Sequence, residues 1–154
     1  NYKPNFKIKK MDNELRKNVR FRWFESLFEL SHYEFQKKVW IDAGIENHVS
    51  DYSETICKYF DDLDLCNGLL KFRDEGFITE IEAEIFIDFH NKLEEFVDDP
   101  EKSNFSDIMI LQDSKWINLT NLAKDKWLKL KENLIQEEEI NYISKLENKF
   151  KQFL

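Results

Sequence analysis

The chain contains few residues that interrupt helices, with only three glycines and two prolines among 154 residues. Glycine and proline are the residues that most often end helices and shape tight turns, so their scarcity predicts long uninterrupted helices. It also excludes a glycine-rich phosphate-binding loop, because no two of the glycines fall within such a motif. The chain therefore lacks the loop chemistry that many nucleotide-dependent enzymes use.

Cysteine and long apolar runs are also scarce, and basic residues are fewer than acidic ones, 23 against 31. Cys57 and Cys66 are the only cysteines and form neither a C-x-x-C motif nor a cysteine–histidine ligand cluster, so both are expected to be reduced thiols of a cytoplasmic protein. No apolar run approaches the roughly 20 residues that a membrane-spanning helix needs. The net charge of -8 argues against direct nucleic-acid binding and favours a basic partner.

Apolar and aromatic side chains at helical spacing are abundant, including 14 phenylalanines and four tryptophans. The tryptophans Trp23, Trp40, Trp116 and Trp127 fall on apolar helical faces and are expected in the core. The clearest of these faces consists of Trp116, Leu119, Ala123, Trp127, Leu130 and Leu134. The pattern predicts an all-α single-domain bundle of about six helices with a long C-terminal helical segment. This domain spans residues 11–154 and follows a basic lead-in, residues 1–10, that need not be ordered.

Helix starts and ends can be assigned at several positions. Ser31 with Glu34, and Thr79 with Glu82, have the spacing of capping boxes and predict two helix starts. Gly44 is the expected stop of the first of these helices.

Three assignments concern segments further along the chain. Asp98-Asp99-Pro100 is expected to end the helix that begins after Thr79. Residues 68–72 are short, apolar and bounded by glycine, so a brief extended segment there stays open. Residues 115–154 contain no glycine or proline and could form one helix or two.

Catalytic and metal-binding patterns are poorly supported. The histidines His32, His48 and His90 lie on separate predicted elements, and no G-x-S-x-G motif accompanies them. A calcium loop counted from Asp62 fails, because the positions of the turn glycine and of the bidentate glutamate hold other residues. The sequence thus predicts no catalytic residue, no metal site and no cofactor.

Acidic residues crowd the end of one predicted helix and the glycine-flanked segment that follows it. Carboxylates at a helix C-terminus gain nothing from the helix dipole, so these residues either start the next helix or meet a cationic partner. The candidate partner-binding residues are Asp61, Asp62, Asp64, Asp74 and Glu75. By contrast, the run 137–139 of three glutamates is expected to cap a helix and face solvent.

Residues 30–40 read Leu-Ser-His-Tyr-Glu-Phe-Gln-Lys-Lys-Val-Trp. They resemble a segment of a small bacterial all-α family whose version reads approximately Leu-Ser-Asp-Pro-Glu-Tyr-Gln-x-x-Val-Trp. The aromatic-Asp-Asp stretch within residues 59–65, the Asp74-Glu75 pair and Trp116 also match the family in spacing. The chain departs from the family at Tyr33 and Phe35, and it extends beyond the usual family end after residue 134.

Some members of this family look like immunity proteins encoded beside contact-dependent-inhibition or other polymorphic toxins. The resemblance therefore implies a cytoplasmic immunity protein that is not an enzyme and that binds a cognate toxin domain, expected to be a basic nuclease. One alternative is a carboxylate- or metal-dependent hydrolase that uses Asp61, Asp62 and a histidine. The other is a helical adaptor that uses its C-terminal helix as a ligand or dimerisation arm. The sequence leaves the oligomeric state open.

Overall fold

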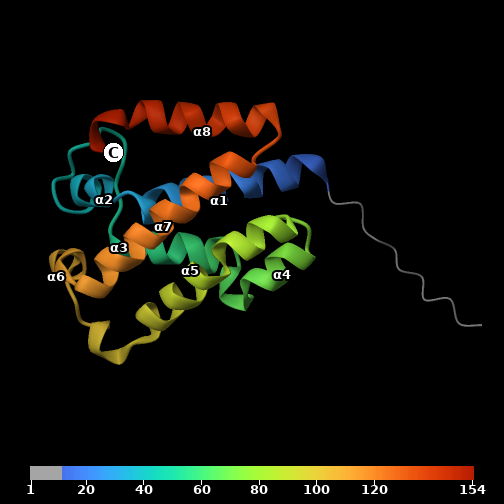
Figure 1. The fold of residues 1–154 in the computed structure, drawn as a ribbon. Helices are drawn as coiled ribbons and strands as arrows, with labels where there is room; N and C mark the ends of the chain where they lie inside the picture. The colour runs from blue at the N-terminus through green and yellow to red at the C-terminus, as the bar shows by residue number, and fades with distance from the viewer. Residues whose placement is uncertain (1–11) are drawn as a thin grey trace, which may run out of the picture.

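A computed structural model describes residues 12–154, and within that range the only regular secondary structure is helical, with no β-strand (Figure 1). The predicted lead-in at residues 1–10 lies outside the described residues. The α-helices are α1 (Asn13–Ser31), α2 (Tyr33–Trp40), α3 (Tyr52–Cys57), α4 (Leu69–Asp74), α5 (Glu80–Asp98), α6 (Asp107–Gln112), α7 (Ser114–Asn133) and α8 (Glu137–Lys149). A π-helical turn, η1 (Lys58–Asp62), continues α3, and short 3-10 turns occupy η2 (Leu65–Asn67), η3 (Pro100–Lys102) and η4 (Lys151–Phe153). The all-α prediction is confirmed.

Helix α7 occupies the middle of the bundle, where it packs against α5 on one side and α1 on the other. In Figure 1, α8 lies over the α1 and α7 layer, and α4 and α5 lie on the opposite side of it. Every side chain of the predicted α7 face, from Trp116 to Leu134, is buried. The four tryptophans are buried as well, so the predicted core is confirmed.

The capping box at Thr79 is confirmed, but the one at Ser31 is wrong. The Thr79 hydroxyl accepts the Glu82 amide at 3.1 Å, and the Glu82 carboxylate accepts the Thr79 amide at 2.9 Å. Ser31 instead ends α1, because its buried hydroxyl donates back to the Phe28 carbonyl at 3.1 Å. A single extended residue, His32, then separates α1 from α2 and contributes no side-chain cap.

Gly44 does not end α2. That helix stops at Trp40, where the Ile41 amide donates to the Lys37 carbonyl at 3.1 Å. Gly44 lies in the loop beyond, and its amide donates to the Lys38 carbonyl at 3.2 Å. The loop between α2 and α3 therefore begins before the glycine.

The segments left open by the sequence are both helical. Residues 69–74 form α4, which starts after Gly68 at a φ of 104°, a conformation that favours glycine. The C-terminal segment is two helices, because Leu134 and Gln136 are extended at ψ 132° and ψ 122° between α7 and α8. The extra short helix and the division near Gln136 bring the described α-helices to eight rather than about six.

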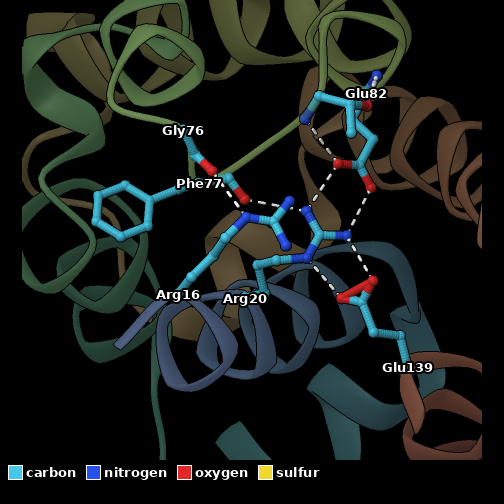
Figure 2. Close-up of polar contacts among 7 residues, drawn as sticks. Arg16, Arg20, Gly76, Phe77, Glu82 and Glu139 are labelled. Atoms are coloured by element: carbon cyan, nitrogen blue, oxygen red, sulfur yellow. Dashed lines mark hydrogen bonds and ion pairs between the residues drawn. The ribbon is translucent and has the colours of Figure 1, made fainter. Parts of the chain in front are cut away.

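A buried ion network ties α1 to α5 and α8 (Figure 2). Arg20 is 2% exposed and donates to both oxygens of Glu82, at 2.7 and 2.9 Å, and to the Phe77 carbonyl at 3.0 Å. The same guanidinium donates to Glu139 at 2.5 and 3.0 Å, while Arg16 donates to the Gly76 carbonyl at 2.9 Å. The prediction that the run 137–139 faces solvent is therefore wrong for Glu139. The side chain of Glu139 is 12% exposed and holds α8 against α1.

Between Asp12 and Leu154, no helix is both long and apolar enough to cross a membrane.

Candidate functional site

The predicted acidic residues begin on an unusual piece of backbone. Asp61 and Asp62 are exposed and lie on the π-helical turn η1, a rare element that often occurs at functional sites. The two carboxylates border different depressions of the surface: Asp61 lines a groove of about 480 Å³ beside α5, and Asp62 lines a cavity of about 390 Å³ beside α1. The turn thus separates two concave sites.

The other three predicted residues have partners of their own. Lys71 Nζ lies 3.9 Å from the Asp64 carboxylate and 3.7 Å from that of Glu75, so it brings these two acids together. Asp74 pairs instead with Arg73 at 3.0 Å. All three are exposed, and none lines the grooves described here. The predicted set therefore divides into two carboxylates on η1 that form no ion pair within residues 12–154 and three that lie beside basic side chains.

A larger groove of about 1190 Å³ runs between α5 and α7. Its acidic side chains outnumber its two lysines, Lys92 and Lys115. Phe96, Leu119 and Leu122 supply an apolar part of the lining. The acidic lining residues are Asp88, Glu94, Glu95, Asp98 and Asp99.

Several of these acids are already engaged. Asp88 pairs with Lys92 at 3.3 Å, Glu94 lies 3.5 Å from the His90 imidazole, and Asp99 accepts the Glu101 amide at 3.0 Å. Glu95 and Asp98 form no ion pair within residues 12–154. These two carboxylates are the ones most available to an external cation.

The second groove, beside η1, shares Glu94 and Asp98 with the first. The C-terminal half of α5 is therefore a ridge with a groove on either side, and Asp61 faces it across the smaller groove. We call the surface formed by Asp61, Glu94, Glu95 and Asp98 the acidic ridge. Sequence analysis missed its α5 members, although Glu94, Glu95 and Asp98 follow a helical spacing opposite the buried Leu93 and Phe96.

The thiols and histidines do not form a nucleophilic pair in the part of the chain that is described. Cys57 donates to the Asp61 carboxylate at 3.2 Å, and this hydrogen bond, with burial and nearby acids, raises the pKa of the thiol. A thiol held protonated in this way is a poor nucleophile. His90 is buried and bonds to the Tyr59 hydroxyl at 2.8 Å, and burial lowers the pKa of its imidazole.

No group of three or more His, Cys, Asp or Glu side chains within residues 12–154 is arranged so that it could hold a metal ion. Cys57 and Cys66 are both free and exposed.

Comparisons of the chain with protein-family models, with curated proteins and with solved structures find no match.

Proposed function

We propose that this chain is an immunity protein that binds and neutralises a cognate toxin domain, a nuclease with a basic active site. The observation that supports it best is the acidic ridge, where Glu95 and Asp98 lack ion-pair partners within the described residues and stand beside a large groove. A nuclease active site needs cationic side chains to hold phosphates, so an acidic surface of this shape is complementary to it. The resemblance of residues 30–40 and 59–65 to a small bacterial all-α family, some of whose members look like immunity proteins, points the same way.

Inhibition of this kind requires binding and no chemistry. Long-range attraction between the acidic ridge and a basic surface raises the association rate toward about 10⁸–10⁹ M⁻¹s⁻¹ at low salt. Slow dissociation needs desolvated apolar contacts beside the charges. Of the apolar side chains that line the same groove, Leu122 is partly exposed, whereas Phe96 and Leu119 are already buried in the core. Leu122 is therefore the apolar side chain of this groove that a partner can cover.

The proposal can be tested by co-expressing this chain with the product of the gene adjacent to its own. We expect the neighbouring toxin to stop growth when expressed alone and to lose that effect when this chain is present. A purified pair should also form a stable complex whose association rate falls as salt is added. Growth arrest that persists beside a well-folded chain, with no complex detected, would contradict the proposal.

Paired variants locate the interface. Glu95→Gln with Asp98→Asn removes two charges from the acidic ridge, whereas Glu46→Gln with Glu132→Gln removes two exposed charges elsewhere. The ridge variant should associate with the toxin about 10-fold more slowly at low salt, since steering contributes about 10–10³ in rate. The control variant should stay close to wild type. Equal rates for both variants would place the interface on another face.

The adaptor alternative finds less support, because the apolar side chains of α8 and of the turn after it already pack against the core. Ile143 and Phe150 are buried, and Leu146 and Phe153 are partly buried against the core. Ile140 remains 42% exposed, but one such residue is no groove-binding face.

A further inference from the structure

The cavity of about 390 Å³ beside Asp62 has a different character from the acidic grooves. It is lined by residues of α1, α2, η1, α8 and the loop after α2, and part of its wall is aromatic. The ring centroids of Phe28, Phe35 and Phe150 lie 4.8 to 5.6 Å from one another, and His48 lies 5.0 Å from Phe150. The volume falls within the range of about 300–1,000 Å³ that small-molecule sites occupy.

A buried carboxylate lines this cavity without a counter-ion. Glu29 is 7% exposed, and its Oε2 accepts the indole N–H of Trp40 at 3.0 Å. That is the one hydrogen bond found for its carboxylate among the described residues, and no ion pair reaches it. Buried charges in proteins are usually paired or fully hydrogen-bonded, because an isolated charge is costly to remove from water. Glu29 is therefore a site where a ligand cation would be stabilised.

Basic side chains that form no ion pair among the described residues line the same cavity. Arg22, Lys58 and Lys149 form no ion pair with any residue from 12 to 154, although many lysines elsewhere in the molecule do. The remaining acids of the lining differ from Glu29, because Glu25 accepts the Tyr142 hydroxyl and Asp62 is exposed. The lining thus holds three bases and three acids, and its free positive charges call for an anionic group.

Two further polar atoms of the lining are buried with no partner among the described residues: the Ser26 hydroxyl and His48 Nδ1. Ser26 is 5% exposed and follows Arg22 by one helical turn, so it lies on the same face of α1 as Arg22 and Glu29. Both atoms have almost no accessible surface, so they lie behind the cavity wall and do not themselves contact a ligand in the cavity.

We propose that this cavity binds a small zwitterion of the α-amino-acid type with an apolar side chain. The protonated amine lies at Glu29, the carboxylate lies toward Arg22, Lys58 and Lys149, and the apolar body packs on the aromatic wall. The amine and carboxylate of such a ligand match the acidic and basic side chains of the lining. A ligand with a single charge leaves either Glu29 or the three basic side chains without an opposite charge. The site is separate from the acidic ridge, so the proposal does not depend on the binding of a toxin.

Calorimetric titration of the full chain tests the proposal with L-phenylalanine and L-leucine as probes. We expect saturable binding at one site per chain for at least one of them. Phenylethylamine and 3-phenylpropanoate each keep the ring and lose one charge, so each should bind at least about 10-fold more weakly. Absence of binding for both amino acids would overturn the proposal. A single-charge probe that binds as tightly as phenylalanine would do so as well.

Variants and a local signal place the ligand in this cavity. Glu29→Gln keeps an acceptor for Trp40 and should weaken amino-acid binding at least about 10-fold. Lys58→Gln should also weaken it, whereas Lys145→Gln, an exposed lysine outside the lining, should not. The indole N–H resonance of Trp40 should shift on titration, because it bonds to Glu29, while that of Trp23 should not. Unchanged affinity in a folded Glu29→Gln variant, or a Trp40 signal that stays fixed, would refute the assignment.

Discussion

Two carboxylates are almost fully buried in the described part of the molecule, and their surroundings are opposite. Glu82 is 4% exposed and has a bidentate Arg20 and the Thr79 amide as donors. Glu29 is 7% exposed and has one indole N–H as donor. The first carboxylate is satisfied by the fold itself, and the second lines a cavity and has no ion-pair partner within residues 12–154.

The difference shows which acidic residues serve the fold and which are available for binding. Glu82 joins α5 to α1 and, through Arg20, to Glu139 of α8 (Figure 2). Glu29, Glu95 and Asp98 have no ion-pair partner within residues 12–154 and line concave surface. A carboxylate that lacks a partner next to a depression is therefore the better candidate for a binding residue.

Removal of the shared guanidinium should have the largest effect on stability. Arg20→Met leaves Glu82 buried without its partner, and breaking a buried ion pair in this way costs about 3–5 kcal/mol. Arg22→Met is the matched control, because Arg22 is exposed and forms no ion pair in the described range. Its effect on the free energy of unfolding should stay within about 0.5 kcal/mol. Urea denaturation measures the free energy of unfolding of both variants. Equal destabilisation of the two would contradict a structural role for the network.

Acidification should weaken the fold through the buried imidazole of His32. His32 is 3% exposed, and burial lowers the pKa of its imidazole to about 4 from 6.5. The unfolded chain therefore takes up a proton that the folded chain refuses as pH falls from 6.5 toward 4. This difference should reduce the free energy of unfolding by about 3 kcal/mol across that window.

The carboxylate of Glu82 affects the free energy of unfolding at lower pH than His32 does. Burial alone would raise its pKa, but the hydrogen bonds and charge of Arg20, with the bonds from Thr79, hold the pKa below its ordinary value. Its contribution is present above the pKa of the unfolded chain and is lost as pH falls through the lowered pKa of the folded state. His32→Phe keeps a ring between Phe28 and Trp127 and should reduce the slope above pH 4, while leaving the part due to buried His90 and this acid-side loss. A slope unchanged by the substitution would assign the pH dependence to other groups.

Much of the fold could be predicted from the sequence because the decisive signals are local. The capping box at Thr79 and the apolar face from Trp116 to Leu134 depend on spacings of three and four residues. The capping box predicted at Ser31 is wrong because a serine–x–x–glutamate pattern is also compatible with the last turn of a preceding helix. The continuing run of apolar side chains up to Leu30 was the stronger signal there.

The contacts that distinguish Glu82 from Glu29 could not be predicted from one sequence. Arg20 and Glu139 are 119 residues apart, and only the packing of α8 on α1 brings them together. The position of Arg20 on an apolar helix face was nonetheless a sign that it needed an acidic partner. Asp61 and the acids of α5 likewise meet across a groove although they are distant in the chain.

The predicted acidic cluster should affect binding and barely affect stability. Asp61→Asn, Asp62→Asn and Asp64→Asn together remove three charges at nearly constant size. Because all three residues are exposed, the midpoint of urea unfolding should change little. Association with the neighbouring toxin should slow and become less dependent on salt. Wild-type rates at both low and high salt would show that these carboxylates only shape the turn and helix start.

Urea unfolding of Glu82→Gln and Glu29→Gln, measured side by side at neutral pH, tests the central contrast most directly. The same atom is exchanged at two buried positions, so differences in size and burial are small. Glu82→Gln should lower the free energy of unfolding by about 3 kcal/mol, because it breaks the buried pair with Arg20. Glu29→Gln should leave the free energy of unfolding unchanged or raise it by up to about 1 kcal/mol, since it removes an uncompensated buried charge. Equal losses for the two variants would contradict the account, because Glu29 would then stabilise the fold as Glu82 does.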